Sequence, residues 1–264
     1  MKAGDLRRIA GITARAARGT LHRVAGGTSR RLNGKRDLIP ILMYHRVRPD
    51  ESSTDGIEPG MYVRAATFER HLSWLARRFT LATLSQAVDA ARSGQAGGLA
   101  VITFDDGWRD NLTDAWPILQ RHGAKATIFV VPDWINEKSG PGEEFLSPDE
   151  VRFLASQGIE IGAHTMSHPK LDQATPEQIE SELQASKAAV AAWTGAPCRT
   201  FAYPYGRFGE AATIAAGRHF DASVVVGGGW WGGAGPMARI PRVSIHDDVT
   251  RFTPMFEARL AGIY

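Results

Sequence analysis

Residues 99–107 read LAVITFDDG, so an apolar run leads directly into two aspartates and a glycine. A short apolar run that ends in turn residues is typical of a strand buried in a parallel sheet. Asp105 and Asp106 then stand at the strand's end, where mutual repulsion and burial are costly for two unpaired carboxylates. A metal ion relieves that cost for one of them. An exposed Asp-Asp-Gly turn is the alternative, which the preceding strand disfavours.

Strands and helices alternate on both sides of this stretch. That alternation predicts an α/β fold with a parallel sheet or barrel, and periodicity alone does not choose between the two. Functional residues are then expected after the C-terminal ends of strands. The other predicted strands are 38–44, 126–131, 159–163, 200–203, 222–226 and 240–244, and the predicted helices are 67–79, 84–92, 111–121, 147–156 and 175–193.

The 264 residues suffice for one large α/β domain with a small extension. The sequence contains no run of 18 apolar residues, so no transmembrane helix is predicted. The single cysteine, Cys198, excludes an intrachain disulfide, and we interpret it as a small structural residue rather than a nucleophile. A polar stretch with glycine and proline, residues 132–144, predicts a loop that lines the substrate site.

The N-terminal segment, residues 1–36, differs in charge from the rest of the chain. It carries a net charge of +9, whereas residues 37–264, the predicted catalytic domain, carry −6. Arginines recur throughout this segment, so it lacks the uninterrupted apolar stretch of a secretory signal. We therefore expect a cytoplasmic protein or one peripheral to the inner membrane surface. Gly26–Ser29 and Asn33-Gly34 predict a linker.

Apolar residues of this segment recur at steps of three or four, which predicts a basic amphipathic helix. Such a helix can lie on an anionic membrane surface, so peripheral membrane contact is one hypothesis and a solvated tail is another. No aromatic residues interleave with the basic ones, so no nucleic-acid partner is expected. The apolar positions are Leu6, Ala10, Ala14, Ala17, Leu21 and Val24.

Two further motifs follow predicted strands. His164-Thr165-Met166-Ser167-His168 places two histidines four residues apart, a spacing that suits binding of one divalent ion. Surface histidines also occur at this spacing by chance. Phe201–Gly206 (FAYPYG) ends a strand in a rigid turn that exposes backbone N–H groups.

Taken in order, these motifs resemble the polysaccharide deacetylases, also called the NodB homology domain or carbohydrate esterase family four. The resemblance extends from about Ile41 to Ile245. Residues 41–47, 125–130, 161–164 and 201–206 are also similar to the poly-N-acetylglucosamine deacetylase branch. The resemblance implies a distorted barrel of about seven parallel strands.

The resemblance also implies the activity and the site. It implies a metal-dependent hydrolase that removes N-acetyl groups from N-acetylhexosamine units of a saccharide. Asp106, His164 and His168 match the metal ligands, zinc first, with cobalt, nickel or manganese also suited to the site. Asp105 matches the base that activates a water molecule, and the backbone N–H of Tyr205 matches a group that holds the oxyanion.

The chain departs from the family at two roles. Ala202 stands where many members carry an arginine that tethers the base, and Arg242, with Arg239 second, is the expected replacement. The acid that protonates the leaving amine is assigned first to His45, which matches the biofilm branch, and second to His246. A structural role for either histidine stays open.

Three tryptophans are candidates for sugar binding. Trp108 directly follows the Asp-Asp-Gly motif, and Trp230 and Trp231 lie in a glycine-rich stretch. Exposed indole rings would stack on sugar faces. For Trp230 and Trp231 the alternative is that the rings pack beneath a loop. Two other functions stay open: an O-acetyl esterase on the same scaffold, and a catalytically silent sugar-binding scaffold.

Overall fold

Seven parallel strands close into a barrel because β1 pairs with β10 on one side and with β5 on the other. The predicted α/β barrel of about seven strands is therefore confirmed. The computed structural model describes residues 3–24, 26–35, 37–137 and 144–263. In order around the barrel the strands are β1 (Ile41–Tyr44), β10 (Ile240–Ser244), β9 (Ala222–Gly228), β8 (Thr200–Ala202), β7 (Glu160–Ala163), β6 (Thr127–Val130) and β5 (Leu99–Phe104).

Three short strands lie outside the barrel. β4 (Thr80–Ala82) pairs in parallel with the first half of β5. β2 (Arg46–Arg48) and β3 (Tyr62–Arg64) form a separate two-stranded parallel sheet, just beyond the C-terminal end of β1.

The barrel strands are buried on both faces, which explains their nearly continuous apolar sequences. On β5, Val101 belongs to the small cluster that fills the barrel, whereas Ile102 belongs to the large core beneath the outer helices. Because side chains alternate along a strand, Thr103 and Asp105 continue the inward series that Val101 begins. The pattern of β5 thus aims Asp105 at the barrel axis.

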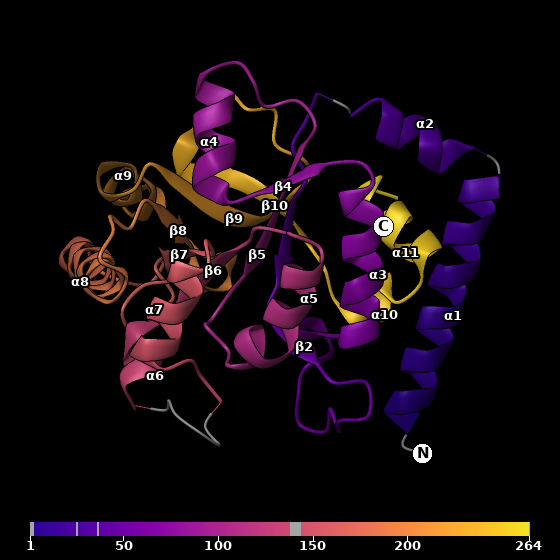
Figure 1. The fold of residues 1–264 in the computed structure, drawn as a ribbon, viewed down its shortest axis with the longest axis horizontal. Coiled ribbons are helices and arrows are strands. Elements are labelled where there is room, and N and C mark those ends of the chain that lie inside the picture. The colour runs from indigo at the N-terminus through magenta and orange to yellow at the C-terminus, as the bar shows by residue number, and fades with distance from the viewer. Residues whose placement is uncertain (1–2, 25, 36, 138–143, 264) are drawn as a thin grey trace.

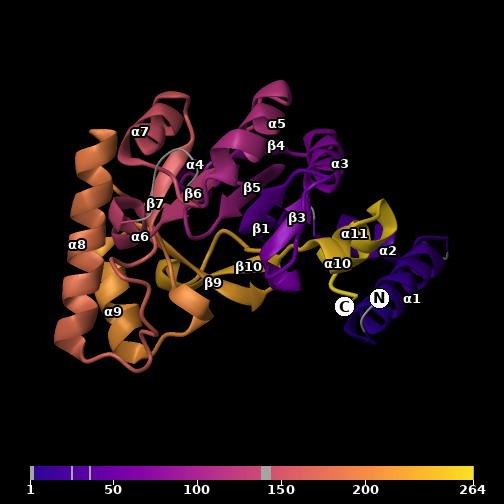
Figure 2. The ribbon, with the colours of Figure 1, turned by 90° about the horizontal axis from the view of Figure 1, so that it is seen from below.

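Helices surround the barrel, with α8 and α9 on one side and α3, α10 and α11 on the other (Figures 1 and 2). A capping box begins α7 (Pro148–Ser156), since the Ser147 hydroxyl accepts from the Glu150 amide and the Glu150 carboxylate accepts from the Ser147 amide. The helices are α3 (Ala65–Ala76), α4 (Leu84–Arg92), α5 (Trp116–Arg121), α6 (Pro132–Glu137), α7 (Pro148–Ser156), α8 (Pro176–Thr194), α9 (Glu210–His219), α10 (Asp247–Thr250) and α11 (Thr253–Leu260).

Two predicted elements have a different form. The helix predicted over 111–121 begins with a π-helical segment, Asn111–Ala115, before α5. The loop predicted over 132–144 begins with α6, and its residues 138–143 lie outside the described residues.

The predicted linker is wrong, because Gly27–Asn33 forms helix α2. α1 (Ala3–Val24) packs beside α11 and α10 at the edge of the molecule (Figures 1 and 2). A Cβ at Gly19 would lie 2.6 Å from the carbonyl oxygen of Pro254, so this glycine permits the close approach. Ile12 and Gly19 form the buried face of α1.

The apolar face predicted for α1 points away from the body. Leu21 is 74% exposed, and Ala10, Ala14 and Ala17 are also exposed, while the side chains of Leu6 and Val24 lie outside the described residues. Within the described ranges, none of the helices is both long enough and apolar enough to cross a membrane.

Candidate metal centre and active site

The three sequence motifs meet at the C-terminal end of the barrel. Asp105 and Asp106 follow β5, and His164 follows β7. The Asp105 amide donates to the Tyr44 carbonyl at 3.0 Å, and the His164 amide donates to the Val130 carbonyl at 3.0 Å. Sheet hydrogen bonding therefore continues one residue past each strand, which fixes the direction of both side chains.

Backbone strain marks the same place. Across the described residues, the four non-glycine residues with positive φ are Asp106 (78°), Thr165 (64°), His168 (63°) and Tyr205 (58°). All four belong to the three motifs. Such conformations cost about 1–3 kcal/mol each, and they cluster at functional sites where the surrounding structure holds them in place.

Asp106, His164 and His168 form a cluster that fits a divalent metal ion. One ligand atom from each residue lies within 4.8 Å of the other two. Oδ1 of Asp106 is 3.5 Å from Nε2 of His164 and 3.6 Å from Nε2 of His168. Two imidazoles and one carboxylate form a common ligand set for zinc and related metals, with further positions left for water and substrate.

The hydrogen bonds of the cluster support this fit. Nδ1 of His164 donates to the carbonyl oxygen of Ala202 at 2.7 Å, which leaves the lone pair of Nε2 toward Asp106. Burial lowers the pKa of His168 to about 4, so its imidazole is neutral near pH 7, as a ligand must be. Burial opposes ionisation of Asp106, but the nearby imidazoles hold its pKa below the usual value.

Trp108 lies against the metal-ligating carboxylate. Its Nε1 donates to Oδ2 of Asp106 at 3.0 Å, so Oδ1 is left toward the two histidines. Its ring stacks on Phe145 at 4.4 Å, and the Arg46 guanidinium lies 4.1 Å from its centroid. Trp108 thus orients Asp106 at the edge of the metal cluster, and its contact with a substrate stays a prediction.

Asp105 is buried beside the cluster and paired with Arg242. The two guanidinium nitrogens of Arg242 donate to the two Asp105 oxygens at 2.6 and 2.8 Å. Arg242 is fully buried, and it also donates to the Thr103 hydroxyl at 3.1 Å. Burial alone would raise the pKa of Asp105, but Arg242 and the nearby imidazoles hold it below the usual value. Arg242 thus makes the contact expected of the replacement tether.

Comparison with known proteins identifies the domain. Residues 93–221 match the family model for polysaccharide deacetylase. The Bacillus subtilis (strain 168) protein YxkH, named as a polysaccharide deacetylase, is 33% identical over 181 residues, which cover 67% of this chain and 60% of YxkH. This domain belongs to the polysaccharide deacetylase family.

Two further matches are consistent with that assignment. A chitooligosaccharide deacetylase of Bradyrhizobium sp. (strain ANU 289) is 33% identical over 107 residues, 40% of this chain and 45% of that protein. The chain thus spans 45–60% of the length of these two curated relatives. The structure of the Streptococcus pyogenes deacetylase PplD shares the fold, with a TM-score of 0.73, 24% identity, and coverage of 81% of this chain and 94% of that one.

In the polysaccharide deacetylase domain, His45 and Tyr205 lie beside the metal cluster. His45 directly follows β1, at the point where the Asp105 amide donates to the Tyr44 carbonyl at 3.0 Å. The ring of Tyr205 is 4.5 Å from that of His168 and is 59% exposed. Both residues therefore lie at the rim of the metal cluster.

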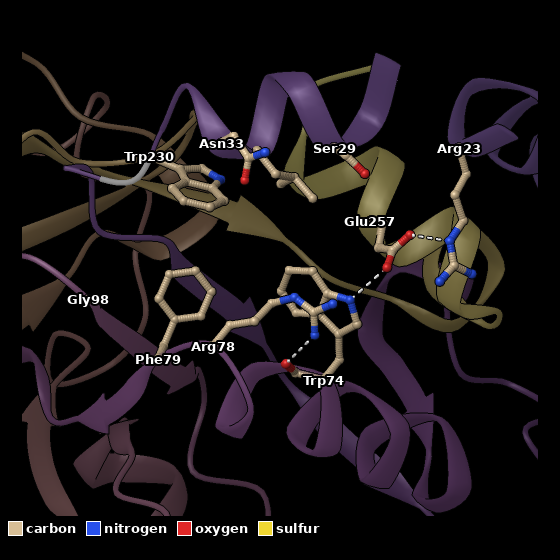
Figure 3. A pocket seen from close by; sticks show the side chains of 10 residues that line it. Arg23, Ser29, Asn33, Trp74, Arg78, Phe79, Gly98, Trp230 and Glu257 are labelled. Atoms are coloured by element: carbon tan, nitrogen blue, oxygen red, sulfur yellow. Dashed lines mark hydrogen bonds and ion pairs between the residues drawn. The ribbon is translucent and has the colours of Figure 1, made fainter. Parts of the chain in front are cut away.

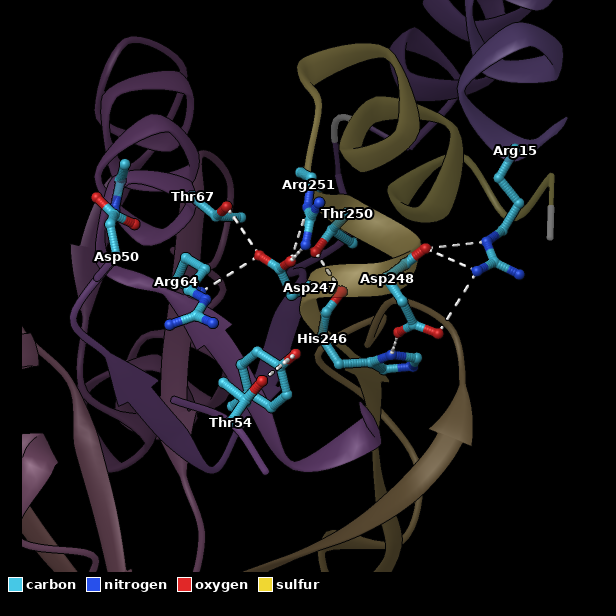
Figure 4. A network of polar contacts seen from close by, with 12 residues as sticks. Arg15, Asp50, Thr54, Arg64, Thr67, His246, Asp247, Asp248, Thr250 and Arg251 are labelled. Atoms are coloured by element: carbon cyan, nitrogen blue, oxygen red, sulfur yellow. Dashed lines mark hydrogen bonds and ion pairs between the residues drawn. The ribbon is translucent and has the colours of Figure 1, made fainter. Parts of the chain in front are cut away.

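His246, the second candidate for the acid, belongs to a different network (Figure 4). Its Nδ1 contacts the Asp248 carboxylate, which also pairs with Arg15 of α1 at 3.5 Å. The neighbouring Asp247 is fully buried and binds the Thr67 hydroxyl at 2.9 Å. His246 thus lies where α10 meets α1 and α3, which favours a structural role. Arg239, the second candidate tether, ends a short 3₁₀ turn, Met237–Arg239, and is exposed.

The prediction that Trp230 and Trp231 stack on substrate is wrong. They are 8% and 3% exposed, so neither ring is open to a sugar face. Trp231 pairs through its backbone with Ile39, which precedes β1, whereas Asp105 follows β5 beside the other end of β1. These tryptophans therefore lie at the end of the barrel opposite the metal cluster.

Sequence inspection missed two residues that shape the site. Trp134 follows β6, and its ring lies 4.8 Å from that of His168. Its position directly after the strand predicted over 126–131 could have indicated a residue of the site. Glu182 on α8 accepts from the amides of Met166 and Ser167 at 2.7 and 2.9 Å, and so holds the loop that carries His168. That contact joins residues 16 positions apart, and no local pattern indicates it.

Proposed function

We propose that the protein is a metal-dependent hydrolase that removes N-acetyl groups from N-acetylhexosamine units of an oligo- or polysaccharide. The observation that carries the proposal is the cluster of Asp106, His164 and His168 beside the buried pair of Asp105 and Arg242. Membership of the deacetylase family and the match to a chitooligosaccharide deacetylase support the substrate class.

The residues divide the reaction among themselves. Asp106, His164 and His168 would hold the metal, with zinc the first choice from the donor set. A bound divalent ion supplies Lewis acidity, which acidifies water and polarises the acetyl carbonyl. Asp105 is kept ionised and aimed by Arg242, so one of its oxygens can take a proton from the attacking water.

The remaining steps fall to residues at the rim. As water adds to the acetyl carbon, a fixed backbone N–H at Tyr205 would hold the oxyanion. Cleavage of the amide C–N bond needs a proton on the leaving nitrogen. His45 is the proposed donor, because it follows β1 beside Asp105, whereas His246 is engaged with Asp248.

The test is acetate release from N-acetylglucosamine oligomers by metal-stripped protein, zinc-reloaded protein and zinc-loaded Asp105→Asn. Asp105→Asn keeps the side-chain shape and removes the base. Activity that appears only with metal and is lost in Asp105→Asn supports both the reaction and the base. Acetate released from O-acetylated xylan but not from the oligomers would replace the proposal with esterase activity. Stoichiometric glycan binding without turnover would favour a silent scaffold.

A further inference from the structure

Strand register places His45 beside the proposed base. β1 and β5 pair in parallel, and the last pair in register is Tyr44 with Phe104. His45 therefore follows opposite Asp105, one residue further on. On β1, Ile41 belongs to the small cluster inside the barrel, whereas Tyr44 belongs to the outer core. Because side chains alternate along a strand, His45 continues the inward series of β1, as Asp105 continues that of β5.

Two adjacent residues after β5 hold the backbone that carries His45. Asn111 is fully buried, and its side-chain amide donates to the carbonyl oxygen of His45 at 2.9 Å. The neighbouring Asp110 accepts from the amide of Val47 at 3.1 Å and from Nε of Arg46 at 2.7 Å. Each of the three residues that follow β1 is thus bonded to the Asp110-Asn111 pair.

The hydrogen bonds of Asn111 indicate a specific role for its amide. Asn111 begins the π-helical segment, and such segments are frequent at functional sites. Its Oδ1 atom is buried and has no hydrogen-bond partner among the described residues, which costs free energy on folding. Leucine has the same number of heavy side-chain atoms and would avoid that cost. What an asparagine contributes here is therefore its Nδ2 group, which bonds to His45 and, at 3.3 Å, to Asp110.

We propose that Asn111, supported by Asp110, is a positioning residue for His45. By holding the His45 carbonyl it fixes the direction of the Cα–Cβ bond, and so the place of the imidazole beside Asp105. This role rests on the proposed function and deepens it, because it assumes that His45 protonates the leaving nitrogen. A small displacement matters, since the donor must lie within hydrogen-bond reach of the atom that it protonates.

Leaving groups of different basicity separate the position of His45 from the general state of the site. When the amide C–N bond breaks, a proton passes from the His45 imidazolium to the nitrogen, and the amine leaves. In 4-nitrophenyl acetate the C–O bond breaks and the phenolate leaves as an anion, without a proton. Misplacement of the acid should therefore slow the amide reaction and spare the aryl ester, whereas damage to the metal cluster or to the base slows both.

The test measures kcat and KM of zinc-loaded wild type, Asn111→Leu and His45→Gln on an N-acetylglucosamine oligomer and on 4-nitrophenyl acetate, with the metal-free ester rate subtracted. We expect Asn111→Leu to lower kcat for the oligomer at least about tenfold, with KM and the ester rate within about twofold of wild type. His45→Gln should lose more on the oligomer and likewise spare the ester. Asn111→Ala, which adds no volume, should match Asn111→Leu. Equal losses on both substrates, or none on either, in both Asn111 variants would overturn the inference.

Two controls separate positioning from stability. Thr113→Val alters the same π-helical segment at an exposed position, where the hydroxyl bonds to Asp114 at 2.7 Å. Phe79→Leu acts at the opposite end of the barrel, where the Phe79 and Trp230 rings border a cavity with centroids 5.9 Å apart (Figure 3). It should lower the melting temperature, because it removes that ring contact. Both controls should keep the wild-type ratio of amide to ester turnover, and a ratio as low as that of Asn111→Leu in either would contradict the positioning role.

Nuclear magnetic resonance gives a readout without turnover. In zinc-loaded protein with nitrogen-15 histidine, the ring signals of His45 are assigned by their absence from His45→Gln. They should shift and broaden in Asn111→Leu and keep their wild-type positions in Thr113→Val. Unchanged His45 signals in Asn111→Leu would reject the positioning role alone. Wild-type turnover of the oligomer by His45→Gln would instead reject the acid assigned in the proposed function, and this inference with it.

Discussion

The guanidinium of Arg242 binds the carboxylate of Asp105, although the strands that carry these two residues do not pair with each other. Arg242 lies on β10 and Asp105 follows β5, and β1 pairs with both strands between them. Two parallel hydrogen bonds of 2.6 and 2.8 Å join residues 137 positions apart, inside the barrel. The pair therefore links closure of the barrel to the state of the proposed base.

Replacement of Arg242 by methionine should destabilise the fold by roughly 3–5 kcal/mol, because it leaves the Asp105 charge buried without a partner. Urea unfolding at pH 7 measures the change. Arg242→Met combined with Asp105→Leu removes both charges, and we expect most of the stability to return while activity stays absent. If the single variant unfolds like the wild type, the pair is not the buried ion pair described above.

Trp108→Phe should weaken zinc binding by roughly 10–100-fold, since it removes the hydrogen bond that orients Asp106 and keeps a ring against Phe145. Competition with a chromogenic chelator measures the affinity. Trp134→Phe is the matched control, because it keeps a ring near His168 and removes no described contact to a ligand atom. Equal affinity for wild type and Trp108→Phe would show that Trp108 does not orient the carboxylate.

Cys198 should resist alkylation in the folded protein. It is 2% exposed, and burial raises the pKa of its thiol to about 12, so little thiolate exists at pH 8. Mass spectrometry after iodoacetamide treatment should find the native protein unmodified and the urea-unfolded protein fully modified. Ser93→Cys, at an exposed position, provides a reactive control in the folded state. Native Cys198 reacting as fast as that control would contradict the prediction.

Local sequence predicted the elements whose cause is local. The strands 99–104 and 240–244 have the predicted bounds. For 99–104, an apolar run flanked by turn residues is sufficient to define a buried parallel strand. The three motifs were found because each directly follows a strand. Closure of the barrel was not determined by periodicity, since the pairing of β1 with β5 joins distant segments.

The errors arose where tertiary contacts decide the outcome. Gly27–Asn33 is helical despite Gly27, because Thr28 is buried and Leu32 packs against the main core. Trp230 and Trp231 lie in a glycine-rich stretch, a composition typical of exposed loops, but that stretch returns to the far end of the barrel and buries both rings. α1 packs through Ile12 and Gly19 rather than through its alanine face, because only a glycine permits the contact with Pro254.

His71 should make the fold less stable as the pH falls from about 6.5 to 4. It is buried against Phe256, with Nε2 donating to the Thr250 carbonyl and Nδ1 accepting from the Tyr44 hydroxyl. Burial lowers the pKa of His71 from 6.5 to about 4, with Arg70 adding to the effect and the Thr250 bond and Asp247 opposing it. The unfolded chain therefore binds a proton at a pH where the folded protein does not, and stability present above pH 6.5 is lost on acidification.

This linkage predicts a loss of about 2 kcal/mol from His71 between pH 7 and pH 5. Urea unfolding of wild type and His71→Gln at both pH values isolates it, because the variant keeps polar contacts but does not titrate. His71→Gln should be less stable than wild type at pH 7, yet lose about 2 kcal/mol less on going to pH 5. Acid groups common to both proteins cancel in this difference. Parallel losses in the two proteins would mean that His71 is protonated in the folded state at pH 5.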